Sequence, residues 1–294
     1  MELGIGIKFW GTRGIISSPG KNHQVFGGNT QCIQLIHNDH LILIDTGFGA
    51  ANLGETLMPR ILENKESLNV HILFTHFHFD HIQGLPFFHP IYFPNNRLDL
   101  YSPNETQDML QNLDLVFDGS YSPFAGLKSM PAVIQCHQLS NELKIGDLTI
   151  TWCPLDHAFN CSDNATWAYK IVNNVSGRST LIATDHEARQ SDCNDNLIKI
   201  GSGVDLLIHD GQYTDAEYKN HVNWGHSSLE MALNNAIAME ANHTLLTHHL
   251  PGRTDYEIEQ LADELRNNKK YQDLNFEFAK EEILYNIGRL LKSA

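Results

Sequence analysis

Residues 70–81 read VHILFTHFHFDH, a short apolar run that leads directly into three histidines and an aspartate. The apolar run is typical of a buried strand that ends in a loop. His76, His78, Asp80 and His81 then occupy four of six consecutive positions. Because imidazole and carboxylate groups are common metal ligands, this spacing predicts a metal site at the end of the strand.

The order of the side chains suggests how the cluster is arranged. Alternation along an extended loop places His76, His78 and Asp80 on one side, with Phe77 and Phe79 on the other, where they are expected to anchor the loop in the core. Two adjacent groups of donors can bind two metals roughly 3.5–4 Å apart, which activate water and stabilise the entering and leaving oxygens of a displacement. The alternative is a chance grouping of histidines, which their density and their position after a strand argue against.

The composition excludes several classes of protein. With 41% hydrophobic and 19% charged residues, the chain has the composition of a globular protein with a substantial core. A net charge of −15 argues against binding extended nucleic acid, which depends on Lys and Arg. The N-terminal residues do not resemble a signal peptide, and no apolar run approaches the roughly 20 residues of a membrane span. We therefore expect neither a membrane nor an extended nucleic acid as a partner.

The cysteines and histidines add two further indications. Five cysteines form no CxxC pair and leave one odd, which favours a reducing cytoplasm over a disulfide framework. They are Cys32, Cys136, Cys153, Cys161 and Cys193. The 17 histidines nearly equal the 20 Lys and Arg residues combined, and histidine is both a metal ligand and a proton carrier.

Apolar runs and helical spacings predict one layered α/β domain over residues 1–294, without repeats or linkers. The expected strands are Gly4–Trp10, Thr30–Ile36, Leu41–Ile44, Val70–Thr75, Leu98–Tyr101, Leu148–Trp152, Thr166–Val172, Thr180–Ala183, Leu206–Ile208 and Thr244–Leu246. The expected helices are Leu53–Asn64, Glu105–Val116, Ser228–Met239 and Tyr256–Arg266. Phe117–Val133, which contains Gly and Pro, is predicted as a long loop that could serve as a lid or be padding.

The HxHxDH motif after an apolar strand resembles the hallmark of the metallo-β-lactamase superfamily. The whole chain resembles the phosphodiesterase branch, which includes tRNase Z and bacterial cyclic-nucleotide-phosphodiesterase-like hydrolases. Short motifs follow the order of that branch: Trp10-Gly11-Thr12-Arg13-Gly14, Phe26-Gly27-Gly28-Asn29-Thr30, Ile44-Asp45-Thr46-Gly47, Ile82-Gln83-Gly84, Leu155-Asp156-His157, Ala183-Thr184-Asp185, Ile208-His209-Asp210, Gly225-His226-Ser227-Ser228 and Leu246-Thr247-His248. The resemblance implies a di-metal hydrolase with a four-layer αβ/βα sandwich.

By this resemblance, seven side chains bind two divalent metal ions. The implied ligands are His76, His78 and His157 for the first metal, Asp80, His81 and His248 for the second, and Asp185 as the bridge. Zinc suits imidazole and carboxylate donors best, with manganese or iron as alternatives. His249 competes with His248 for the last position, and His248 is preferred because it directly follows Leu245-Leu246-Thr247.

The resemblance also implies a proton donor. His226 corresponds to the histidine that assists the leaving group in tRNase Z, and Asp210 takes the place of its acidic partner, which is a glutamate there. We count Asp80 with these two as the predicted catalytic residues. The alternative for His226 is a structural position at a helix start, beside Ser227 or Ser228 as the N-terminal cap.

Three further residues are assigned from their positions in loops. Asp45 lies at a strand end and is expected to orient a metal ligand, although a turn-forming role before Gly47 is nearly as good. Arg13 and Asn29 are candidate substrate contacts, because Arg suits phosphate oxygens and both lie in loops expected to approach the site. A structural role in Gly-rich turns is the alternative for both residues.

These residues predict hydrolysis of a small anionic phosphodiester, such as a cyclic nucleotide, by a metal-bridging hydroxide. Processing of tRNA 3′ ends is an alternative, disfavoured by the acidic charge and by a 117–133 loop with one basic residue, Lys128. A thioester or ester hydrolase of the same fold is disfavoured because the segment around His157 lacks a TPGHT-like motif. A non-catalytic metal-binding sensor is disfavoured because every expected ligand is present. Members of this branch are often dimers, so a homodimer stays open.

Overall fold

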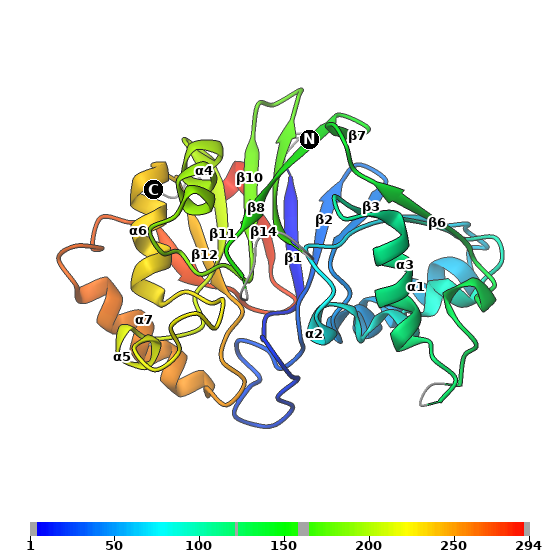
Figure 1. Cartoon of the computed structure of the whole chain (residues 1–294), viewed down its shortest axis with the longest axis horizontal. Coiled ribbons are helices and arrows are strands. Elements are labelled where there is room, and N and C mark those ends of the chain that lie inside the picture. The colour runs from blue at the N-terminus through cyan, green and yellow to red at the C-terminus, as the bar shows by residue number, and fades with distance from the viewer. Residues whose placement is uncertain (1–4, 121–122, 158–164, 291–294) are drawn as a thin grey trace.

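A computed structural model describes residues 5–120, 123–157 and 165–290 of the chain. Within them, two seven-stranded sheets face each other, with helices on both outer sides (Figure 1). The first sheet has the order β14-β1-β2-β3-β4-β5-β6 and the second β13-β12-β11-β10-β9-β8-β7. This arrangement confirms the predicted α/β sandwich.

The first sheet consists of β1 (Gly6–Gly11), β2 (Cys32–His37), β3 (His40–Ile44), β4 (Asn69–Leu73), β5 (Arg97–Ser102), β6 (Val133–Gln138) and β14 (Leu284–Asn286). The second sheet consists of β7 (Leu143–Ile145), β8 (Leu148–Leu155), β9 (Thr166–Asn173), β10 (Ser179–Ala183), β11 (Leu206–Asp210), β12 (Thr244–Thr247) and β13 (Phe276–Phe278). The helices are α1 (Gly49–Leu62), α2 (Phe79–Ile82), α3 (Thr106–Val116), α4 (Asp192–Gly201), α5 (Asp215–Tyr218), α6 (Leu229–Met239), α7 (Asp255–Asn267) and α8 (Ile287–Leu290), with 3-10 turns η1 (Leu85–Phe87), η2 (His89–Tyr92) and η3 (Leu127–Ser129). Among the described residues, no helix has both the length and the hydropathy that a bilayer crossing requires.

Strand alternation builds the layers. In β3, Leu41 and Leu43 pack with the helices outside the first sheet, whereas Ile42 and Ile44 face the second sheet. The second sheet repeats this pattern, since Leu207 of β11 packs toward α4 and Ile208 toward the first sheet. Strands buried on both faces are rich in Val, Ile and Leu, which is why these runs are almost continuously apolar.

The parallel strands in the two sheets direct their carboxyl ends toward one region. Strands β3 to β6 run parallel, as do β10 to β13. Open α/β sheets bind ligands outside the carboxyl ends of their strands. Asp45 follows β3, Asp185 follows β10 and His248 follows β12, so the two sheets deliver the predicted site residues to this edge.

The loop after β4 differs from the prediction at one position. Phe77 is partly buried against the core, and its ring lies 5.5 Å from that of Phe74, as expected of an anchor. Phe79, however, is 62% exposed, so its predicted place in the core is wrong. The reason is that α2 begins at Phe79, and the two-residue period of an extended chain ends there.

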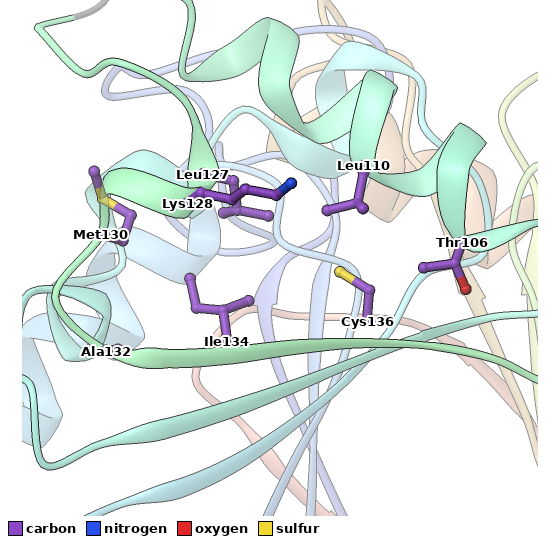
Figure 2. Close-up of a pocket in the computed structure, with 8 residues that line it drawn as sticks. All are labelled: Thr106, Leu110, Leu127, Lys128, Met130, Ala132, Ile134 and Cys136. Atoms are coloured by element: carbon purple, nitrogen blue, oxygen red, sulfur yellow. The ribbon is translucent and has the colours of Figure 1, made fainter.

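The long loop 117–133 is only partly irregular. Residues 121–122 lie outside the described part of the chain, while the 3-10 turn η3 buries Leu127 in the core. Between α3, η3 and β6 lies a pocket of about 370 Å³ (Figure 2). Thr106, Leu110, Leu127, Lys128, Met130, Ala132, Ile134 and Cys136 line it. None of these is a predicted site residue, and the lid role stays a prediction.

The cysteines agree with the sequence analysis as far as they are described. Cys32 and Cys153 are buried free thiols, and Cys136 is a half-buried one. Burial raises the pKa of Cys153 to about 12, so its thiol stays protonated and unreactive at neutral pH. Cys161 lies outside the described residues, and the predicted absence of disulfides therefore stays a prediction.

Candidate metal centre

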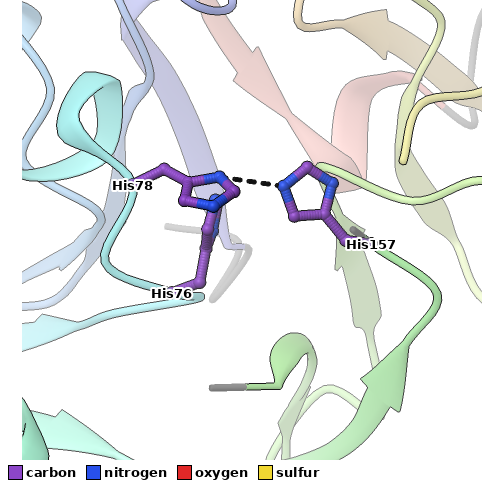
Figure 3. Close-up of side chains that lie close together, drawn as sticks. All are labelled: His76, His78 and His157. Carbon is purple, nitrogen blue, oxygen red and sulfur yellow. Dashed lines mark hydrogen bonds between the residues drawn. The ribbon is translucent and has the colours of Figure 1, made fainter. Parts of the chain in front are cut away.

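The predicted ligands come together in two adjacent groups. His76, His78 and His157 form one group, in which the ring nitrogens converge (Figure 3). Asp80, His81, Asp185 and His248 form the other, in which every pair of donor atoms lies within 4.8 Å. The ligands come from the β4–α2 loop, from α2 and from the ends of β8, β10 and β12, so residues up to 172 positions apart along the chain meet here.

Asp185 lies between the two groups. Its Oδ1 is 3.8 Å from Nε2 of both His76 and His157, on the first side. Its Oδ2 is 3.1 Å from Nε2 of His81 and 3.2 Å from Nε2 of His248, on the second side. One carboxylate thus offers an oxygen to each group, which is the geometry required of a bridging ligand.

The polar atoms at the centre lack partners. Nε2 of His76, His81 and His248, together with Oδ2 of Asp185, are buried and make no hydrogen bond. Buried polar atoms are rarely left unsatisfied, because each costs about 1–3 kcal/mol. Four such atoms converging from two sheets fit a pair of metal ions, since nitrogen and oxygen lone pairs are then used for coordination.

Hydrogen bonds on the far side of each ring direct these lone pairs inward. His157 donates from Nδ1 to the carbonyl of Gly225 at 2.8 Å, and His248 donates from Nδ1 to Oε1 of Gln212 at 2.9 Å. Because Nδ1 donates in each of these bonds, Nε2 is the ring nitrogen that faces the centre and is available to a metal.

Asp45 performs the same function for His81. Its Oδ2 accepts a hydrogen bond from Nδ1 of His81 at 2.8 Å. The same carboxylate accepts bonds from the backbone N–H and the hydroxyl of Thr75, both at 2.8 Å. It therefore ties the start of the metal-binding loop to its last ligand, as a ligand-orienting residue would.

Three of the strand-end residues adopt a left-handed backbone. Asp45, Asp185 and His248 have φ values of 60°, 55° and 60°. This region is uncommon for residues other than glycine, and each instance costs about 1–3 kcal/mol. Such strain persists only where surrounding contacts enforce it, and here it turns each side chain from the end of its strand toward the centre.

Burial and charge separate the two groups electrostatically. Burial lowers the pKa of His157 to about 4 and that of His76 well below its usual value, so both rings are neutral ligands. Burial also opposes charge on His81, but the carboxylates of Asp185, Asp80 and Asp45 raise its pKa well above the usual value. Carboxylates that draw a proton onto His81 would draw a metal cation in its place.

His226 and Asp210 form a buried pair beside the metal ligands. Nδ1 of His226 lies 2.7 Å from Oδ2 of Asp210, so the aspartate reaches its partner despite being shorter than glutamate. The ring stacks on that of His248 at a centroid distance of 4.9 Å. With Nδ1 bound to Asp210, Nε2 is left to carry or receive a proton.

His249 faces away from this cluster. Its Nε2 is 3.0 Å from the carbonyl oxygen of Ala279, and burial lowers its pKa to about 3. His248 instead contributes to the second donor group. The geometry therefore favours His248 over His249 as the last ligand.

The side chains of the two expected substrate contacts are engaged in contacts between loops. Arg13 is fully buried, and its guanidinium donates to the carbonyls of Gly27, Leu250 and Arg253. Asn29 donates from Nδ2 to Oε2 of Glu281 at 2.9 Å. Both side chains hold loops together. The burial of Arg13 corrects the expectation that it contacts substrate, whereas for Asn29 that contact stays a prediction.

A buried hydrogen-bond network beneath the site was not expected from the sequence. Its members are neighbours of site residues: Asp156 donates from its backbone to Nδ1 of His186 at 3.2 Å, and His209 donates from Nδ1 to the carbonyl of Asp210 at 2.8 Å. Two asparagines from α4 and α6 connect these ends. His186 bonds to Asn194 at 2.9 Å, Asn235 donates to Asn194 at 2.8 Å, and Asn235 approaches Nε2 of His209 at 3.1 Å. Their position next to site residues in the sequence is the signal that could have revealed them.

A comparison with protein families identifies a match over most of the chain. The model of the Beta-lactamase superfamily domain matches residues 40–249, which include every predicted metal ligand. A search of curated protein sequences found no match.

Solved structures share the fold at low sequence identity. A diphosphatase from the PhnP family is 18% identical, with a TM-score of 0.65, and the alignment covers 96% of this chain and 97% of that one. The short form of human tRNase Z is 19% identical, with a TM-score of 0.64 and coverage of 96% and 99%. Unliganded yeast PDE1 is 16% identical, with a TM-score of 0.64 and coverage of 95% and 98%. At these identities the likeness concerns the fold alone.

Proposed function

The chain belongs to the metallo-β-lactamase superfamily, and from this premise we propose that it is a di-metal phosphodiesterase acting on a small phosphodiester. The observation that carries the proposal is the position of Asp185, with one oxygen toward each group of histidines. The similar structures include proteins named diphosphatase and tRNase Z, names that denote cleavage at phosphorus. They support this choice of reaction over ester or thioester hydrolysis.

The donor atoms suit two zinc ions. His76, His78 and His157 would hold one ion, Asp80, His81 and His248 the other, and Asp185 would bridge them. All donors are imidazole nitrogens or carboxylate oxygens, which zinc accepts in four-coordinate sites, with manganese or iron as alternatives. When bound, two such ions lower the pKa of water between them and neutralise charge on the phosphoryl oxygens.

The protein's own groups supply orientation and proton transfer. Asp45, Gln212 and the carbonyl of Gly225 fix the rings of His81, His248 and His157 before substrate arrives. Nε2 of His226 can pass a proton to the departing alkoxide, and Asp210 holds the ring in the orientation that this transfer needs. Pre-oriented groups of this kind need little rearrangement during reaction.

The charge of the chain supports a small substrate. A net charge of −15 disfavours a long polyanion, whereas the metal ions would attract a single phosphodiester locally. We therefore propose a compact phosphodiester such as a cyclic nucleotide in preference to precursor tRNA.

The experiment combines metal analysis with a substrate panel. Protein loaded with zinc should bind two ions per chain and hydrolyse bis(p-nitrophenyl) phosphate and at least one cyclic nucleotide. His226→Ala should retain both ions and lose about 10²–10⁴-fold in kcat toward a substrate with an alkoxide leaving group. The panel should also contain precursor tRNA and a thioester. Cleavage of either one alone, or an active His226→Ala enzyme, would contradict the proposal.

A further inference from the structure

The metal centre opens to solvent on the side of His78. This residue is exposed, whereas the other residues of the two donor groups are buried. A substrate must therefore enter past His78 and the side chains around it. What those side chains are determines which part of a substrate, besides its phosphate, can be bound.

Three exposed apolar residues are neighbours of the predicted metal ligands, either along the chain or through a backbone hydrogen bond. Phe79 stands between His78 and Asp80 in the sequence and is 62% exposed. Ile15 is 50% exposed, and its backbone N–H donates to Oδ2 of Asp80 at 2.8 Å. Trp224 is 61% exposed and precedes Gly225, whose carbonyl binds His157. Single exposed apolar residues are ordinary on a surface, but three from separate segments next to one metal site form a pattern.

The loop that carries Trp224 is held rigidly. The buried carboxylate of Glu187 accepts hydrogen bonds from the backbone N–H of Asn223 at 2.8 Å and of Gly225 at 3.2 Å, on either side of the tryptophan. The guanidinium of Arg189 donates to the side chain of Asn223 at 2.6 Å. An exposed aromatic ring on a braced loop needs no ordering before it binds a ligand, which favours a recognition role.

Aromatic rings connect Trp224 with the proposed proton donor. The indole contacts His221 edge-on at a centroid distance of 4.9 Å, and His221 stacks on Tyr213 at 4.5 Å. Tyr213 in turn lies 6.2 Å from the ring of His226. This series of rings thus leads from the exposed Trp224 to His226.

Ile15 is the strained member of the three. Its φ of 66° is a left-handed conformation, which is a genuine outlier for a β-branched residue. The hydrogen bond from its N–H to Asp80 holds the strained residue at the metal centre. Strain of this kind is found at ligand-contacting positions, where surrounding structure enforces it.

We propose that Ile15, Phe79 and Trp224 form an apolar rim that binds a flat aromatic ring carried by the phosphodiester, with Trp224 as its main contact. Every nucleobase has such a ring, and stacking on an aromatic side chain binds bases without regard to their sequence. The inference rests on the proposed phosphodiesterase function and narrows its substrate to ring-bearing esters.

The test compares two ligands that differ only in the ring. Adenosine 5′-monophosphate and ribose 5-phosphate share the phosphate and the sugar, and titration calorimetry on the zinc-loaded protein gives Kd for each. We expect the nucleotide to bind about 5- to 150-fold more tightly, the range that one stacked base provides. Trp224→Ala should reduce this ratio to near one without changing Kd for ribose 5-phosphate, and Trp224→Phe should restore part of it. Tyr256→Ala, which removes an equally exposed ring on α7, should leave both constants unchanged.

Other outcomes would overturn the rim. If the nucleotide binds no more tightly than ribose 5-phosphate, or if neither ligand binds, recognition of the ring is excluded. Equal weakening of both ligands in Trp224→Ala would show that the residue only supports the loop. These binding results do not depend on turnover. If bis(p-nitrophenyl) phosphate is not hydrolysed but the nucleotide still binds more tightly than ribose 5-phosphate, the proposed function is wrong and the proposed apolar rim is supported.

Discussion

Replacing Asp45 with Asn should weaken binding of the second metal and leave that of the first unchanged. Asp45 accepts three hydrogen bonds, from the N–H and hydroxyl of Thr75 and from Nδ1 of His81. An asparagine retains one acceptor oxygen but presents an NH₂ group where His81 now donates. Two donors cannot face each other, so the imidazole changes tautomer, and Nε2 then carries the proton instead of a lone pair for the metal.

The magnitude follows from the arrangement of ligands. Loss of a hydrogen-bond partner that orients a metal ligand costs about 10- to 100-fold in metal affinity, or about 1.4–2.8 kcal/mol. His81 belongs to the second donor group alone, so the cost should fall on one ion. Folding should be little affected, because burial raises the pKa of Asp45 and a neutral amide removes that cost of burying charge.

Competition with a chelator measures both affinities. The wild-type protein should bind two zinc ions with high affinity. In Asp45→Asn one ion should keep its Kd, and the Kd of the other should rise about 10- to 100-fold. Asp99→Asn is the matched control, since Asp99 is buried and lies 2.7 Å from a histidine nitrogen of His137, outside the site. Two ions of unchanged affinity in Asp45→Asn would refute the reasoning, as would equal losses in the control.

Three further predictions concern the network, the pH dependence and the metals. Asn235→Leu should lower kcat about tenfold with little change in KM. Leu233→Ala in the same helix should lower the Tm at least as much as Asn235→Leu does, and should leave kcat unchanged. Burial raises the pKa of Glu281 to about 7. Its protonated form therefore contributes stability, up to about 3 kcal/mol, that is fully present below about pH 4.5 and is lost as the pH rises through 7. The Tm should depend less on pH in Glu281→Gln than in the wild-type protein. Removing the metals with a chelator should lower the Tm by several degrees, and zinc should restore it; an unchanged Tm would argue against ions at the buried unpaired atoms.

The parts of the site that could be predicted are those written in short stretches of sequence. His76, His78, Asp80 and His81 are neighbours in the chain, so their pattern is visible before any folding is considered. The strands could be predicted for the same reason, because burial on both faces makes them continuous apolar runs. His157, Asp185 and His248 followed only from the resemblance, since no local pattern relates positions so far apart.

The failures also have physical causes. Arg13 was assigned by its suitability for phosphate, but its carbonyl partners Leu250 and Arg253 are 237 and 240 residues away, and only the tertiary fold reveals its burial. Phe79 was placed in the core by extended-chain alternation, which ends where α2 begins. The asparagine network was missed because a polar residue within an apolar helix face indicates burial only once its partner on another helix is known.

The network and the strained strand ends account together for the rigidity of the site. Left-handed backbone at Asp185 and His248 costs about 1–3 kcal/mol per residue, and a metal alone could be bound by flexible side chains without it. The next residue after Asp185 is His186, which is fixed by Asn194, and His248 is itself held by its hydrogen bond to Gln212. Contacts between the protein's own side chains thus hold both strained residues. We therefore expect metal binding to change the backbone little, and hydrogen exchange of the strand-end amides should be nearly the same in the apo and zinc-loaded protein. Strong protection that appears only with zinc would show that the metals, rather than the protein, impose the geometry.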